Sequence, residues 1–322
     1  MTNSGLIAIN PLTLVPNYRA GTNMFIWNEK TGTTVKFLSS EQMVTESTFS
    51  FLLANPSQKV FVEDSSHQSY QEYLIENLES WLVEPRIPRI LKTTVIAECS
   101  HGRFSRAFQK KSVRDLVECS MECSLQLAQI GHHIQMDGRE LQRTLRHDAS
   151  FVTHAVNTAF YAYLIAENRG YCEKMITEVC VGAMMHDVGK IEPWLLDCNS
   201  DSLSETRKDW TKRNGQSHPI EGFRRLCNEP GITETHLLMC YQHHERLDGK
   251  GFPVGLMSEE IHEASKICAV ANRFEGLTSD CSHRQAMTRL AAFRVLESEK
   301  KTALDSEMIQ CLNTKMSHCS TT

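Results

Sequence analysis

The stretch Met185-His186-Asp187-Val188-Gly189-Lys190 sets an imidazole beside a carboxylate at the end of an apolar helical pattern. Imidazole nitrogen binds iron, manganese or zinc, and a carboxylate has two oxygens with which to bridge two cations. A single His-Asp pair says little, since His147-Asp148 repeats it earlier in the chain. The later pair predicts a metal site because more histidines follow at helical separations. Gly189 is expected to take the left-handed conformation that stops the helix.

Length and composition predict a soluble, globular chain of 322 residues, of which 41% are hydrophobic and 23% charged. The formal net charge of -5 argues against a basic surface that wraps DNA or RNA. The twelve cysteines are scattered without a CxxC pair, which favours reduced thiols and a cytoplasmic location. No apolar run approaches the ~20 residues of a membrane span. Neither nucleic acid nor a membrane is therefore expected as a partner.

The order of hydrophobic patterns predicts a mainly α chain in three parts. Residues 1–88 combine short β-rich pieces with one helical pattern, which predicts a small α+β domain with a regulatory or dimerising role. A dimerising role would make the protein a homodimer. Residues 89–145 are predicted to form a helical linker. Residues 146–322 are predicted to form an all-helical bundle that builds a metal centre in its core.

Several helices of this third part each contribute side chains that can bind metal. The apolar spacing predicts helices over 151–168, 173–185 and 233–244, and a further helix that Ser258 caps. The candidates outnumber the ligands of one tetrahedral zinc ion, so two metal ions are favoured, with Asp187 as the bridge. A structural cluster of core histidines is the alternative. The candidate ligands are His154, His186, Asp187, His218, His243, His244 and Asn272.

The same segments resemble the HD-GYP domain, a subgroup of the HD phosphohydrolases that hydrolyse cyclic di-GMP in bacterial second-messenger signalling. The resemblance covers residues 148–284 and is most specific in the run from Gln242 to Pro253, which reads QHHERLDGKGFP. His154, the 186–190 stretch, Ser217-His218-Pro219 and the run from Val270 to Asp280 also match. The resemblance implies an HD-type bundle that holds two divalent metal ions, with iron or manganese ahead of zinc.

The resemblance also implies a reaction and roles for particular residues. A metal-bridging hydroxide would hydrolyse one phosphodiester bond of cyclic di-GMP, with Asp187 as the bridging ligand. Lys190 would neutralise the phosphate or protonate the leaving oxygen, and Arg284 would bind the second phosphate. Phe252 would lie in the loop that controls substrate access. The implied partners are cyclic di-GMP and a diguanylate cyclase domain.

The chain departs from the family pattern at four positions. Phe252 replaces the tyrosine of Gly-Tyr-Pro, and Asn272 replaces an aspartate that binds metal. Ser150 replaces a glutamate that goes with a third metal, and Cys281 replaces a phosphate-binding cation. These departures leave open a catalytically impaired sensor of the same fold, which binds cyclic di-GMP or a partner without turnover. A hydrolase acting on another nucleotide phosphate is the third interpretation.

Overall fold

The computed structural model describes residues 5–28, 31–55, 58–148, 150–191, 216–280, 284–300 and 302–317. Cys281 lies outside the described residues. The chain divides into two compact units. Unit 1 consists of residues 1–102, 134–136 and 140–145, and unit 2 consists of residues 103–133, 137–139 and 146–322. The expected linker at 89–145 is shared between the two units, and the domain boundaries inferred from the sequence stay predictions.

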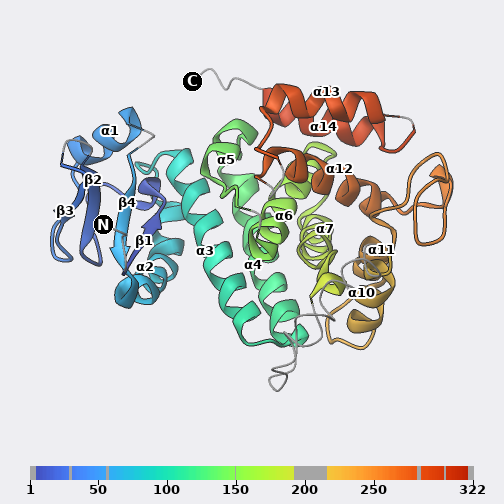
Figure 1. The fold of residues 1–322 in the computed structure, drawn as a ribbon, viewed down its shortest axis with the longest axis horizontal. Helices are drawn as coiled ribbons and strands as arrows, with labels where there is room; N and C mark the ends of the chain where they lie inside the picture. The colour runs from blue at the N-terminus through green and yellow to red at the C-terminus, as the bar shows by residue number, and fades with distance from the viewer. Residues whose placement is uncertain are drawn as a thin grey trace. The chain divides into compact units, whose positions relative to one another are not determined.

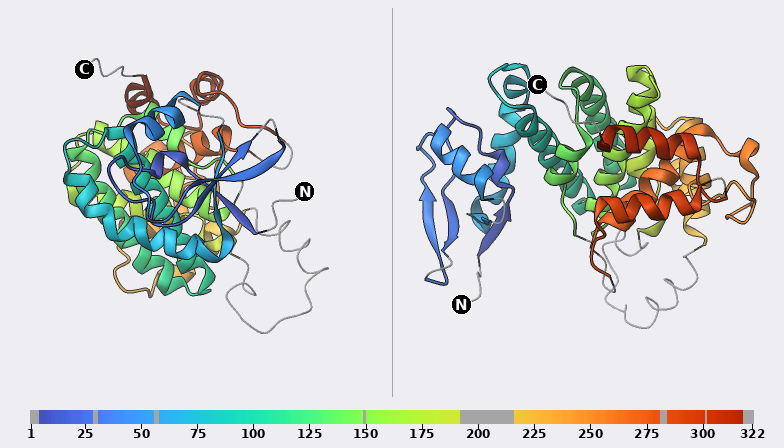
Figure 2. Two further views of the ribbon diagram at one scale, coloured as in Figure 1. Left: turned by 90° about the vertical axis from the view of Figure 1, so that its left-hand side faces the viewer. Right: turned by 90° about the horizontal axis from the view of Figure 1, so that it is seen from above.

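Unit 1 contains a four-stranded antiparallel sheet with strand order β1-β4-β2-β3 (Figure 2). The strands are β1 (Leu6–Ile9), β2 (Met24–Asn28), β3 (Thr33–Leu38) and β4 (Val60–Glu63). Helix α2 (Asp64–Val83) follows β4 directly and buries Leu74, Leu78 and Trp81. The unit also contains α1 (Glu46–Ala54), the first part of α3 (Arg89–Gln109) and most of α5 (Gly138–Thr144). The predicted small α+β fold is confirmed.

Unit 2 is a helical bundle built around α7 (Glu173–Met185), with α7 near the centre of the bundle in Figure 1. Helix α7 packs against α4 (Val113–His133), α6 (Phe151–Asn168), α11 (Glu234–Gln242) and α12 (Glu263–Thr278). The turn η2 (Val188–Lys190) packs against α10 (His218–Leu226). Helices α13 (Arg289–Glu299) and α14 (Ser306–Ser317) contact each other and α12. The predicted all-helical bundle is confirmed.

Helix α6 is buried along most of its length, and His154 is the exception within its middle part. From Val152 to Ala166 every side chain except His154 is buried. A helix that is covered on all sides belongs to the core of a bundle, and its apolar side chains are stabilised by removal from water. Between Val152 and Ala166 the single opening is therefore at His154, which keeps 22% of its side chain exposed.

Two local predictions are wrong. Gly189 does not belong to the glycines with positive φ. Glycine is needed there because a Cβ atom would lie 2.0 Å from the His218 carbonyl oxygen, so the residue allows η2 and α10 to approach closely. Ser258 begins the short helix η3 (Ser258–Glu260), and the cap of α12 is His262, whose side chain accepts a hydrogen bond from the Ala264 N–H.

No helix among the described residues combines the length and the apolar character that a membrane span requires.

Candidate metal centre

The ends of three helices and the side of a fourth bring the predicted ligands together in unit 2. His186 is the C-terminal cap of α7, and Asp187 precedes η2. His218 is the first residue of α10, and His243 is the C-terminal cap of α11. His154 reaches the same place from the first turns of α6. Residues separated by as many as 89 positions, from His154 to His243, therefore meet because four helices pack around one point.

The Asp187 carboxylate lies between two pairs of histidines. Its Oδ2 atom is 3.4 Å from His154 Nε2 and 3.5 Å from His186 Nε2. Its Oδ1 atom is 3.3 Å from His218 Nε2 and 3.4 Å from His243 Nε2. Within the described residues, Oδ1 makes no hydrogen bond although it is buried. One oxygen per histidine pair is the arrangement that lets a single carboxylate serve two cations.

Three of these imidazoles are held by their Nδ1 atoms. His186 Nδ1 donates to the Ala183 carbonyl oxygen at 2.7 Å, and His243 Nδ1 donates to the Cys240 carbonyl oxygen at 2.8 Å. His154 Nδ1 lies 2.5 Å from Oε2 of Glu275. A carbonyl or a carboxylate oxygen accepts, so each Nδ1 carries the proton. In a neutral ring, Nε2 then carries the lone pair that can bind a metal.

The Nε2 atoms of each histidine pair face one another at short range. The distance is 3.2 Å between His154 and His186, and 3.1 Å between His218 and His243. Two nitrogen lone pairs repel at such a distance unless a cation is shared between them. The ligand atoms form two groups that share Asp187: His154 and His186 in one, and His218, His243 and His244 in the other. This arrangement of ligand atoms fits metal ions.

The pKa shifts follow from burial and from the two carboxylates. Burial lowers the pKa of His186 and of His243, so both rings are neutral near pH 7. Burial also lowers the pKa of His154, but its contacts with Asp187 and Glu275 have the larger combined effect and raise it to about 9. Burial raises the pKa of the Asp187 carboxyl, and the nearby His186 and Lys190 more than reverse this. The site therefore attracts positive charge.

The run of residues after His244 builds the loop beside the site. The buried Glu245 carboxylate accepts hydrogen bonds from the backbone N–H groups of Val254, Gly255 and Leu256, at 2.8, 3.0 and 2.9 Å. The Phe252 ring then stacks on the His244 ring, with centroids 4.6 Å apart and an interplanar angle of 19°. The predicted loss of a tyrosine hydroxyl is thus accompanied by an aromatic contact that orients His244.

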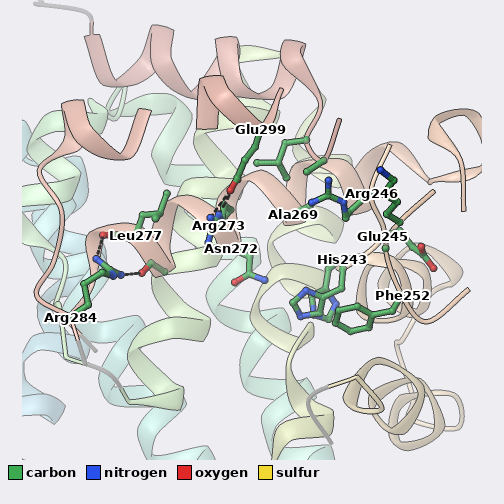
Figure 3. Close-up of a pocket in the computed structure, with 16 residues that line it drawn as sticks. His243, Glu245, Arg246, Phe252, Ala269, Asn272, Arg273, Leu277, Arg284 and Glu299 are labelled. Atoms are coloured by element: carbon green, nitrogen blue, oxygen red, sulfur yellow. Dashed lines mark hydrogen bonds and ion pairs between the residues drawn. The ribbon is translucent and has the colours of Figure 1, made fainter. Parts of the chain in front are cut away.

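A cavity of about 600 Å³ opens on this centre. His243, His244 and Phe252 line it together with Asn272, and Arg284 also lines it, well separated from His243 in Figure 3. Further charged side chains of its wall are Glu245, Arg246, Lys250, Arg273 and Glu299. The Arg273 guanidinium pairs with Glu299, at 3.0 and 2.5 Å. The excess of cationic groups suits an anionic ligand.

Three predicted site residues lie outside the two groups of candidate metal ligands. Asn272 lines the cavity, and its carboxamide makes no hydrogen bond with a described residue, so metal binding by Asn272 stays a prediction. The Arg284 guanidinium donates to the Gly276 and Leu277 carbonyl oxygens at the end of α12, at 2.5 and 2.9 Å. Lys190 Nζ lies 2.6 Å from Asp187 Oδ2. Phosphate binding by Arg284 and Lys190 also stays a prediction.

Glu275 belongs to the site, although the sequence did not indicate it. Its side chain is 3% exposed and contacts His154, which lies 121 positions away. A glutamate on an amphipathic helix normally points into solvent, so its type gives no signal. Its place three residues after Asn272 puts both side chains on one face of α12, and that spacing was the available clue.

Comparisons with known proteins agree with this geometry. Residues 150–308 match the family model described as HD domain. The chain is 29% identical over 238 residues to the cyclic di-GMP phosphodiesterase response regulator RpfG of Xanthomonas campestris, covering 72% of this chain and 60% of that protein. It is 31% identical over 160 residues to a cyclic di-GMP phosphodiesterase of Thermotoga maritima, covering 49% of this chain and 42% of that protein. The chain thus spans only about half of the length of these relatives.

A solved structure shares the fold. Bd1817, an HDG"Y"P protein from Bdellovibrio bacteriovorus, superposes with a TM-score of 0.63 at 18% identity, covering 97% of this chain and all of that chain. The match of residues 150–308 to the HD domain model confirms the resemblance seen in the sequence at the level of the HD domain. His186 and Asp187 lie within the matched residues.

Proposed function

We propose that the protein hydrolyses a phosphodiester bond of cyclic di-GMP at a centre of two divalent metal ions. The observation that carries the proposal is the position of the Asp187 carboxylate, with one oxygen facing each pair of histidine Nε2 atoms. The relatives named as cyclic di-GMP phosphodiesterases support the choice of substrate. The bound metals would supply Lewis acidity and a water of lowered pKa.

The residues of the chain would bind and orient the substrate. A cyclic dinucleotide carries two phosphates, and the cavity of about 600 Å³ falls within the ~300–1,000 Å³ of small-ligand sites. Arg246 and Lys250 line its wall, so they would attract the anion as it enters. Lys190 keeps 44% of its side chain exposed while its Nζ contacts Asp187, so it can donate to a phosphate oxygen without leaving the centre. It is also placed to give a proton to the leaving oxygen.

The metal ligands would be His154, His186 and Asp187 for one cation, and Asp187, His218, His243 and His244 for the other. Asn272 would complete one of the two sites with its amide oxygen. Iron or manganese fits an imidazole and carboxylate set, and zinc is the third choice. The imidazoles are already oriented by Ala183, Cys240 and Glu275, so little rearrangement would accompany binding.

A turnover assay tests this proposal. Protein purified without oxygen and loaded with Fe²⁺ or Mn²⁺ is expected to convert cyclic di-GMP to linear pGpG or GMP, and the same sample treated with chelator is expected to lose the activity. Unchanged cyclic di-GMP with both metals would contradict the proposal. Tight binding of cyclic di-GMP without turnover would instead support a sensor of the same fold, which the neutral Asn272 in place of an anionic ligand favours.

A further inference from the structure

Glu275 makes a set of contacts that fixes its carboxylate behind one metal ligand. Its Oε2 atom lies 2.5 Å from His154 Nδ1. Its Oε1 atom accepts a hydrogen bond from the Ser279 hydroxyl at 2.6 Å, and the Asn157 amide approaches it at 3.4 Å. The side chain is 3% exposed. Burial of a carboxylate is unfavourable unless the carboxylate is paired. The position of Glu275 beside His154 therefore suggests that its charge has a role at the centre.

The ligand set of the centre carries little negative charge for two divalent cations. Asp187 is the one carboxylate in the two groups of facing ligand atoms among the described residues. The other members are imidazoles, and Asn272 offers a neutral amide. Two divalent cations would therefore bring four positive charges to a ligand set with one negative charge. Glu275 is a buried carboxylate that reaches the centre through the ring of His154.

We propose that Glu275 is a positioning residue for His154 that also supplies the negative charge which Asn272 does not. The Glu275 carboxylate holds the proton on Nδ1, directs Nε2 toward Asp187 and increases the basicity of that nitrogen. Asn272 and Glu275 lie one helical turn apart on α12. In this chain a second negative charge thus lies on the far side of an imidazole, one helical turn from the neutral Asn272. The inference rests on the metal centre of the proposed function.

A purely structural role for Glu275 makes a different prediction. If Glu275 only joined α6 to α12 through Asn157 and Ser279, its replacement would change stability and nothing at the centre. A carboxylate placed at position 272 would then have no reason to repair the damage. If Glu275 supplies charge to the cation, a carboxylate at position 272 can replace part of that charge. The effects of substitutions at positions 272 and 275 on metal affinity are then coupled.

Mn²⁺ affinity, measured by equilibrium dialysis, tests the inference without any assay of turnover. Glu275→Gln keeps the size of the side chain and removes its charge, and it is expected to weaken Mn²⁺ binding about 10- to 100-fold. Adding Asn272→Asp to this variant is expected to restore most of the affinity. Ser279→Ala is the matched control, because it removes a hydrogen bond from the same carboxylate and leaves the charge; it is expected to weaken binding less than about 10-fold.

Wild-type affinity in a folded Glu275→Gln variant would overturn the inference, and so would a double variant that binds no better than Glu275→Gln alone. Glu275→Asp keeps the charge but draws it back from Nδ1 by one methylene, so its affinity is expected between those of wild type and Glu275→Gln. If Glu275→Gln does not fold, the Mn²⁺ affinity of Glu275→Asp is compared with that of wild type instead. Protein that shows the expected affinities but leaves cyclic di-GMP intact would contradict the proposed hydrolysis and leave this inference standing.

Discussion

The Nε2 atoms of His154 and His186 lie 3.2 Å apart, although the Nδ1 atom of each ring is already bound to an oxygen acceptor. Neither ring can satisfy the other by donating a hydrogen bond while both are neutral. Asp187 Oδ2 is within 3.5 Å of both Nε2 atoms. The three atoms converge on a point that a cation can occupy, and the same relationship recurs on the Oδ1 side with His218 and His243.

Replacing the shared carboxylate should disable both sides of the centre. Asp187→Asn is expected to lose at least one bound metal and to lower turnover of cyclic di-GMP by more than about 100-fold, because an amide cannot give an anionic oxygen to each of two cations. Metal content and initial rate are measured on the same sample. The control is Asp148→Asn in the earlier His-Asp pair, where the carboxylate accepts hydrogen bonds from Ser150 N and Thr153 Oγ1. It should keep its metals, and a normal rate in Asp187→Asn would exclude a bridging role.

Lys190 should act on the substrate and not on the metals. Lys190→Met keeps an aliphatic chain of similar length and removes the ammonium group that contacts Asp187. Loss of one charge-assisted hydrogen bond to a phosphate, about 1.5–3 kcal/mol, is expected to lower kcat/KM by about 10- to 100-fold with metal content preserved. Lys174→Met, at an exposed position of α7, is the matched control. An unchanged kcat/KM in Lys190→Met would remove Lys190 from the reaction.

The loop after His244 should depend on one buried carboxylate. Glu245→Gln replaces an anion that accepts three backbone N–H groups with an amide of the same size. The expected loss of unfolding free energy is about 1.5–3 kcal/mol, because hydrogen bonds to a charged group are the stronger kind. Urea unfolding measures it. Glu260→Gln, which weakens the exposed hydrogen bond from Met257 N, should lose less than about 1 kcal/mol, and equal losses would contradict a special role for Glu245.

The free energy of unfolding should decrease at acid pH because His236, a buried histidine outside the metal centre, has a lowered pKa. His236 is 3% exposed, and its Nδ1 accepts a hydrogen bond from Thr233 N at 3.1 Å. Burial lowers its pKa to about 4, although Glu178 opposes the shift. The unfolded chain, with a pKa near ~6.5, binds more protons between about pH 6.5 and pH 4. Stability is therefore full above about pH 6.5 and declines by up to about 3 kcal/mol as the pH falls to about 4.

The difference between wild type and His236→Gln isolates this contribution. Unfolding is measured at several pH values with chelator present, so that metal release does not contribute. The slope of unfolding free energy against pH should be smaller in His236→Gln, and replacement of the exposed His132 by glutamine should leave the slope as it is. Equal slopes in wild type and His236→Gln would show that the folded ring takes up a proton freely.

The sequence predicted the bundle well where apolar spacing is strong. The bounds expected for α6 and α7 match the structure at both ends, because their buried faces are continuous and their ends carry clear signals. Strand β1 (Leu6–Ile9) was missed, because a run of four apolar residues is too short to show the alternating pattern that predicts a strand. Ser258 was chosen as a helix cap on residue type alone, whereas the tertiary structure uses His262.

The sequence indicated the histidines and the aspartate that the structure brings together, and it missed the groups that orient them. The histidines and Asp187 stood out because their chemistry is unusual at the ends of apolar helices. Glu275 did not, because a charged residue on a helix usually faces water and its partner His154 lies far away in the sequence. The same holds for the Ala183 and Cys240 carbonyl groups that orient His186 and His243. Backbone acceptors carry no signal in residue type, so only packing reveals them.

Anaerobic titration of the wild-type protein with Mn²⁺, followed by electron paramagnetic resonance, tests the central claim most directly. The two ligand groups share one carboxylate, so two Mn²⁺ ions should bind per chain and couple magnetically, which gives a spectrum distinct from that of isolated Mn²⁺. Saturation at one uncoupled ion per chain, or no binding above the background of a denatured sample, would contradict a centre of two metals bridged by Asp187.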